Sequence, residues 1–145
     1  MTPAMTPQTH RFLVVDDDEG VTQTFAGILR LEGHQVRTAS NAQDALREVE
    51  SFNPDAILLD LRMPMVNGFG FLYRLRALST GRSVPVAMIT ADCSMDDEAT
   101  RELQELGADL WQKPLWTEEL LALTGQLLAR TTQRRAAEFS REACG

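Results

Sequence analysis

The sequence predicts an α/β fold in which five helices cover both faces of a doubly wound, five-stranded parallel sheet. Short apolar runs alternate strictly with segments whose apolar residues recur at helical spacing, which is the pattern of consecutive βαβ units. The apolar runs are too short to be helices. With 145 residues, of which 43% are hydrophobic, the chain has enough material for one core and short tails.

Five short segments of the chain are predicted to be strands, most of them as apolar runs and residues 35–39 by alternation of polar and apolar residues. The third is the most apolar and leads directly into Asp60, and the fourth leads into Thr90. The expected ranges are residues 12–15, 35–39, 55–59, 84–89 and 109–112. Right-handed crossovers between them give a parallel sheet, for which we expect the strand order 2-1-3-4-5.

The helices lie between these runs and carry recognisable start and stop signals. Gly33 ends the first helix, over residues 19–31, and Gly107 follows the fourth, which reaches about Leu106. Asn41 is placed to cap the second helix, and the fifth starts near Thr117. In the third helix, after Gly68, the residues expected to face the core are Phe69, Leu72, Leu75 and Leu78.

The composition of the chain predicts its domain organisation and limits the partners that it can bind. Residues 11–130 are expected to form the domain, residues 1–10 a disordered tail, and residues 131–145 a helical extension, tail or linker. The net charge of −7 argues against direct nucleic-acid binding by this domain. No apolar run is long enough for a bilayer, and the start of the chain lacks a signal-peptide core. Two distant cysteines favour the cytoplasm.

Polar residues gather where predicted strands end. Asp16 and Asp17 follow the first strand, Asp60 the third, Thr90 the fourth and Lys113 the fifth. The carboxyl ends of parallel strands meet at one sheet edge, where open α/β sheets bind their ligands. A single Asp at a strand end can simply begin a turn. The five together predict a functional site.

The charges of this site predict a metal ion. Two carboxylates about 4 Å apart repel by roughly 4 kcal/mol at an effective dielectric constant of 20, and Lys113 cannot neutralise three of them. A hard divalent cation with oxygen ligands resolves the repulsion. Mg²⁺, or Mn²⁺ in its place, suits a site that keeps bound water and meets a phosphate.

From Phe12 to about Leu128 the sequence resembles the receiver domains of response regulators in two-component signalling, which have a flavodoxin-like fold. Each matching stretch is weak alone, but four in the right order on the right elements are specific. They are residues 14–18 (VVDDD), 58–68 (LLDLRMPMVNG), 89–91 (ITA) and 113–114 (KP).

The resemblance implies a role for each site residue. Asp60 would accept a phosphoryl group from a histidine kinase or a histidine phosphotransfer protein, with Thr90 and Lys113 contacting phosphoryl oxygens. The implied Mg²⁺ ligands are Asp16 (largely through water), Asp17, Asp60 and the backbone carbonyl of Arg62. The Lys113–Pro114 peptide is expected to be cis. Such a protein assists its own phosphorylation and dephosphorylation and is not a conventional enzyme.

The sequence departs from the family pattern before Lys113. Receivers usually carry an aromatic switch residue three positions earlier, where this chain has Leu110 followed by Trp111. Either Trp111 takes the role through a register shift, which we prefer, or Leu110 does. Trp116 is predicted either to contact a partner or to fold over the helix end. These residues lie on the face made by the fourth helix, fifth strand and fifth helix. In receivers this resembles the surface whose shape depends on phosphorylation, and it often serves for dimerisation or partner docking.

Other interpretations remain open at this point. Arg62 and Asp92 could form an ion pair at the pocket rim. Residues 16–21 (DDDEGV) faintly resemble the nucleophile loop of haloacid-dehalogenase-type phosphatases, with Asp16 as nucleophile, but Gly20 breaks that match. A pseudo-receiver that binds proteins without being phosphorylated is the main alternative. The chain is either a stand-alone receiver or part of a longer regulator.

Overall fold

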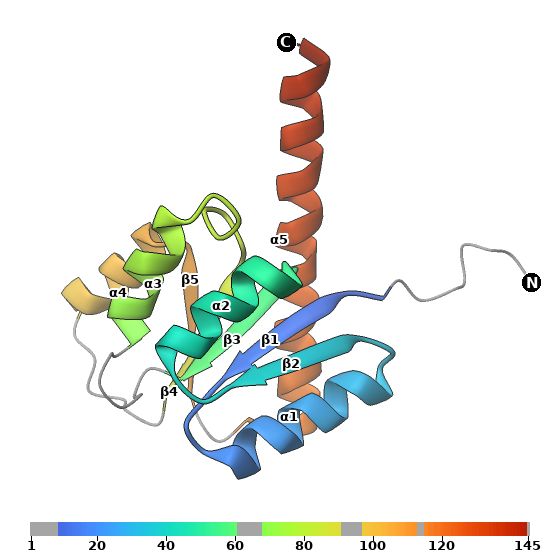
Figure 1. The fold of residues 1–145 in the computed structure, drawn as a ribbon, viewed down its shortest axis with the longest axis vertical. Helices are drawn as coiled ribbons and strands as arrows, with labels where there is room; N and C mark the ends of the chain where they lie inside the picture. Colours follow the sequence, from blue (N-terminus) through green and yellow to red (C-terminus); the bar gives the residue numbers. More distant parts are fainter. Residues whose placement is uncertain (1–8, 61–67, 91–96, 113–114, 145) are drawn as a thin grey trace, which may run out of the picture.

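A computed structural model of the chain describes residues 9–60, 68–90, 97–112 and 115–144. Within these ranges five strands alternate with five helices, as the sequence predicts (Figure 1). The strands are β1 (Arg11–Val15), β2 (Gln35–Ala39), β3 (Ala56–Asp60), β4 (Val86–Thr90) and β5 (Ala108–Gln112). The helices are α1 (Glu19–Leu31), α2 (Ala42–Phe52), α3 (Gly68–Ala77), α4 (Asp97–Glu105) and α5 (Thr117–Cys144).

The strands form one parallel sheet in the order β2-β1-β3-β4-β5, which confirms the predicted topology. Side chains that alternate along each strand enter two separate cores. Leu13 and Val15 of β1 pack toward α2, α3 and α4, whereas Phe12 and Val14 pack toward α1 and α5. Helices on both faces therefore hold the sheet's strand ends in fixed positions.

The local signals read from the sequence act as expected. The Asn41 side chain accepts the Asp44 amide at the start of α2, at 2.8 Å. Gly33 and Gly107 follow α1 and α4 with φ of 94° and 75°, a left-handed conformation that glycine adopts without strain. The expected inner face of α3 needs one correction. Phe71 is fully buried together with Leu72 and Leu75, whereas Phe69 and Leu78 are only partly buried.

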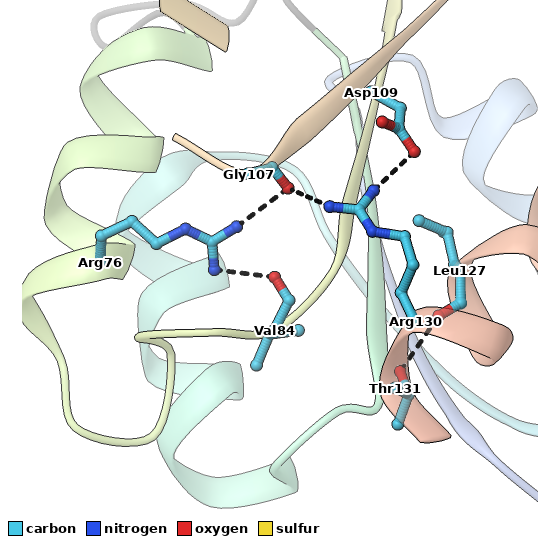
Figure 2. Close-up of polar contacts among 7 residues, drawn as sticks. All are labelled: Arg76, Val84, Gly107, Asp109, Leu127, Arg130 and Thr131. Carbon is cyan, nitrogen blue, oxygen red and sulfur yellow. Dashed lines mark hydrogen bonds and ion pairs between the residues drawn. The ribbon is translucent and has the colours of Figure 1, made fainter. Parts of the chain in front are cut away.

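Polar contacts fasten α5 to the amino-terminal edge of the sheet (Figure 2). The Arg130 guanidinium pairs with Asp109 at 2.6 Å and donates to the Gly107 carbonyl at 3.1 Å. The buried Thr131 hydroxyl donates to the Asp55 carbonyl at 2.7 Å. Beyond these contacts α5 continues to Cys144 and projects away from the sheet (Figure 1). Residues 131–144 thus continue the helix.

None of the helices in the described part of the chain is both long and apolar enough to cross a bilayer.

A histidine pair near the start of β1 predicts a pH-dependent stability. The His10 amide donates to His34 Nδ1 at 3.2 Å, and the His34 ring packs edge-on against Phe12. Burial and the nearby His10 lower the pKa of His34 from 6.5, although Glu32 and Asp55 act in the opposite direction. The folded state therefore takes up the His34 proton less readily than the unfolded state. Stability should fall as the pH drops below about 6.5 toward the lower folded-state pKa.

The test compares urea unfolding at about pH 7.5 and about pH 5.5 for wild type, His34→Gln and His10→Gln. The acid-induced loss of stability should be smallest in His34→Gln, because that side chain cannot be protonated. An equal loss in His34→Gln and wild type would assign the effect to other groups.

Candidate functional site

Three strands deliver polar side chains to the carboxyl-terminal edge of the sheet. Asp16 and Asp17 directly follow β1, Asp60 is the last residue of β3, and Thr90 is the last residue of β4. Ile89 pairs in register with Asp60, so Thr90 lies one residue further along the neighbouring strand. Asp16, Asp60 and Thr90 are buried, while Asp17 is exposed. The structure thus brings together four of the five predicted residues.

Asp16, Asp17 and Asp60 form a carboxylate cluster. Each contributes an oxygen atom, and these three oxygens lie within 4.8 Å of one another. At such distances ionised carboxylates repel strongly, and burial of Asp16 and Asp60 limits screening by water. Oxygen-only donors with one side open to solvent fit the preference of Mg²⁺, and of Mn²⁺, for carboxylates and retained water. The donor set therefore fits the divalent ion predicted from the sequence.

Backbone contacts fix the loop between β1 and α1. The Asp16 amide donates to the Ala39 carbonyl at 3.1 Å, and one Asp16 carboxylate oxygen accepts the Asp18 amide at 3.0 Å. The Asp18 side chain accepts the Val21 amide at the start of α1. No role was predicted for Asp18, although an Asp before a helix is a recognisable N-cap signal.

A cleft opens from the carboxylate cluster toward α1 and α2. It has a volume of about 410 Å³, and Asp16 and Asp17 form part of its wall. The other lining residues are Glu19, Thr22, Gln23, Thr38, Ser40 and Asp44. Asp16 and Asp17 are therefore reachable from solvent on this side.

Several predicted features lie outside the described residues. These are the ammonium of Lys113, the backbone carbonyl of Arg62, the Arg62–Asp92 ion pair and the geometry of the Lys113–Pro114 peptide. They remain predictions from the sequence.

The register of β5 bears on the switch residue. Leu110 pairs with Met88, and both belong to the core beneath α2, α3 and α4. Trp111 pairs with Ile89, and both belong to the core beneath α1 and α5. Because side chains alternate along a strand, Thr90 is expected on the same face as Met88 and Leu110. This geometry favours Leu110 over Trp111, the reverse of the preference drawn from the sequence.

Trp116 lies at the start of α5, where its carbonyl accepts the Leu120 amide. Its side chain is 70% exposed, so it does not fold over the helix end. Trp116 therefore stands in solvent at the carboxyl-terminal side of the sheet and is available to a partner.

A groove of about 450 Å³ marks the face formed by α4, β5 and α5. Its wall consists of Thr100, Leu103 and Gln104 of α4, residues 108–111 of β5, and Gln126 of α5.

The only buried residue of α4 in the described range is Leu103. Tyr73 of α3 donates a hydrogen bond to Glu102 of α4, and this carboxylate raises the pKa of Tyr73. Among its described residues α4 thus buries a single side chain, which suits an element that moves.

Comparisons with known proteins agree with this geometry. The profile of the response regulator receiver domain family matches residues 12–124. The transcriptional regulatory protein PrrA of Mycobacterium leprae is 40% identical over 121 residues, which are 83% of this chain and 50% of PrrA. The response regulator MprA of Mycolicibacterium vanbaalenii is 38% identical over 122 residues, 84% of this chain and 52% of MprA. The chain thus spans about half the length of these relatives.

Solved structures show the same fold. The chemotaxis response regulator CheY4 of Vibrio cholerae superposes with a TM-score of 0.75 at 30% identity, covering 83% of this chain and 100% of CheY4. NtrX of Brucella abortus gives a TM-score of 0.81 at 27% identity, covering 92% of this chain and 30% of NtrX.

Proposed function

This chain belongs to the response regulator receiver domain family of two-component signalling, and from that premise we propose that it is switched by phosphorylation of Asp60. The observation that carries the proposal is the cluster of Asp16, Asp17 and Asp60, whose carboxylate oxygens lie within 4.8 Å of one another. Family membership also supports this proposal over the phosphatase interpretation, in which Asp16 would be the nucleophile.

The chemistry is a transfer of a phosphoryl group between two side chains. An Asp60 carboxylate oxygen attacks phosphorus, and the bond between phosphorus and the donor's imidazole nitrogen breaks. Asp16, Asp17 and Asp60, with the Arg62 carbonyl, would hold Mg²⁺ or Mn²⁺, which offsets the charge gathering at the phosphoryl oxygens. The Thr90 hydroxyl and the Lys113 ammonium would bind those oxygens. The acyl phosphate is labile to water, so the signal is limited in time.

The proposed phosphoryl donor is a histidine kinase or a histidine phosphotransfer protein. The exposed Trp116 offers such a partner an apolar anchor, and a separate cleft lined by Asp16 and Asp17 opens beside the carboxylate cluster. The net charge of −7 supports the absence of direct nucleic-acid contact by this domain. The two widely separated cysteines support a cytoplasmic location.

Mass measurement tests the proposal directly. After treatment with acetyl phosphate and Mg²⁺, the intact protein should gain the mass of one phosphate, and peptide mapping should place it on Asp60. The gain should vanish when a chelator removes the metal. A protein that takes up no phosphate from acetyl phosphate or from any phosphohistidine donor would instead be a pseudo-receiver that acts by binding alone.

The same proposal includes how phosphorylation of Asp60 changes the surface that contacts a partner. Phosphate on Asp60 would draw Thr90 inward, and Leu110, on the same face of the sheet, would follow into the vacated space. Because Leu103 is the only buried residue of α4 in the described range, this shift would reshape the groove between α4, β5 and α5. A coupling of about 1–3 kcal/mol is enough to switch such a surface. We propose that the reshaped groove receives a second copy of the chain or a partner.

Beryllofluoride, a mimic of the phosphoryl group, should therefore change self-association. Sedimentation of wild type should show a larger species with the mimic than without it. Gln104→Arg, which places a charge at the groove, and Trp116→Ala should each weaken that response, while Leu31→Ala, which removes an exposed side chain of α1, should not.

Gln104→Arg and Trp116→Ala show whether the groove, Trp116 or both are needed for self-association. A loss in Gln104→Arg alone assigns association to the groove and leaves Trp116 to the phosphoryl donor. An unchanged response in both variants would remove the α4–β5–α5 face from the output.

A further inference from the structure

The loop between β1 and α1 holds a third carboxylate that the proposed chemistry does not use. Asp18 is exposed and lies outside the group formed by Asp16, Asp17 and Asp60. Its side chain nevertheless accepts a hydrogen bond from the backbone. One carboxylate oxygen accepts the Val21 amide at 3.2 Å, and the backbone of Asp18 is extended, with φ −85° and ψ 106°. Asp18 is thus the N-cap of α1.

The backbone of Asp18 connects this cap to the carboxylate cluster. Its carbonyl accepts the Thr22 amide at 3.1 Å, which places Asp18 in the first turn of the helix. Its own amide donates to the carboxylate of Asp16 at 3.0 Å. One residue therefore contacts the start of α1 through its side chain and carbonyl, and the buried Asp16 through its amide.

This connection also constrains Asp17. The residue lies between Asp16, whose amide is bound to the Ala39 carbonyl, and Asp18, which is fixed by the cap. Asp17 is exposed, so burial does not hold its side chain in place. Its carboxylate nevertheless lies within 4.8 Å of those of Asp16 and Asp60. The anchored residues on both sides give a physical reason for that position.

We propose that Asp18 is a positioning residue of the divalent-cation site. Its side-chain cap holds the Asp18 amide on Asp16 and so orients Asp16 and Asp17 toward Asp60. The negative charge of Asp18 is secondary. This inference rests on the proposed function, because it assumes that the carboxylate cluster binds Mg²⁺ or Mn²⁺. Contacts that orient metal ligands commonly change metal affinity by 10- to 100-fold when they are lost.

Two substitutions at one position separate the cap from the charge. Asp18→Asn removes the charge and keeps the cap, because Asn caps helices as well as Asp. Asp18→Ala removes both. Asn41→Ala is the matched control, since it removes the equivalent cap of α2 and leaves the β1–α1 loop intact. Asp17→Asn removes a proposed ligand.

Calorimetric titration of each folded variant with Mg²⁺, and again with Mn²⁺, measures the effect. Asp18→Ala should bind about tenfold more weakly than wild type, Asp18→Asn within about twofold, and Asp17→Asn more weakly than either. Asn41→Ala should bind like wild type. Rescue of affinity by Asn at position 18 is the result that a purely electrostatic role would not produce.

Other outcomes would overturn the inference. Equal losses in Asp18→Asn and Asp18→Ala would assign the effect to charge, and wild-type affinity in Asp18→Ala would leave only a structural cap. A loss in Asn41→Ala as large as in Asp18→Ala would indicate general loosening of the sheet edge.

A metal-free measurement distinguishes failure of this inference from failure of the proposed function. The backbone amide of residue 18 should exchange hydrogen faster in Asp18→Ala than in Asp18→Asn, because loss of the cap frees this amide from Asp16. If wild type binds no divalent ion, the proposed function fails, whatever the exchange rates. If wild type binds the ion but the exchange rates are equal, the link from cap to Asp16 is wrong.

Discussion

Asp60→Asn should take up no phosphoryl group from acetyl phosphate under conditions in which wild type gains one. The amide of Asn has no anionic oxygen to attack phosphorus, so the loss should be complete. Asp60 is buried at the end of β3, and Asn fills nearly the same volume. Intact-mass analysis of both proteins after identical treatment measures the difference.

The folding of Asp60→Asn and its stabilisation by Mg²⁺ provide the control for this variant. Two carboxylates 4.8 Å apart repel by roughly 3.5 kcal/mol at an effective dielectric constant of about 20, and the substitution removes one member of the cluster. Asp60→Asn should therefore stay folded without metal, and Mg²⁺ should raise its melting temperature less than that of wild type. Phosphate uptake at the wild-type level by this variant would mean that another residue is the acceptor.

Arg76→Ala should lower the free energy of unfolding by about 2–4 kcal/mol. The Arg76 guanidinium donates hydrogen bonds to four backbone carbonyls, those of Gly81, Val84, Leu106 and Gly107, at distances of 2.7 to 3.3 Å (Figure 2 draws two of them). These carbonyls belong to the connections before β4 and before β5. Without the guanidinium they lose a charged donor in a partly buried environment, and both connections loosen.

Urea unfolding of Arg76→Ala beside Arg74→Ala measures this effect. Arg74 lies on the same helix but is exposed, so its substitution should change stability by no more than about 0.5 kcal/mol. Similar small losses in both variants would show that water replaces the Arg76 hydrogen bonds without cost. A loss confined to Arg76→Ala would establish it as the residue that joins α3 to the α4–β5 turn.

Much of the fold and most of the candidate site were predictable because their causes are local. The cap of α2 at Asn41 and the stops at Gly33 and Gly107 depend on a few neighbouring residues, and each acts as expected. Strict alternation of strands and helices forces a parallel sheet, whose carboxyl ends share one edge. For that reason the sequence alone predicts that Asp16, Asp17, Asp60 and Thr90 lie together.

Periodicity alone could not decide which side chains fill a given face. In α3 both Phe69 and Phe71 are compatible with a helical stripe, and only packing against the sheet shows that Phe71 is the fully buried one. Leu110 and Trp111 are adjacent, so the pairing of β5 with β4 decides which one shares the face of Met88. The exposure of Trp116 is likewise a property of its surroundings.

The sequence by itself determined the elements, their order and the edge at which the carboxylates meet. The tertiary structure decided which residues join distant segments, as Arg76 does with Leu106, 30 positions away, and Thr131 with Asp55, 76 positions away. Helix caps and strand alternation depend on neighbours within a few residues, which a sequence displays directly. Contacts between distant segments depend on how helices settle on the sheet, and that follows from the packing of the whole core.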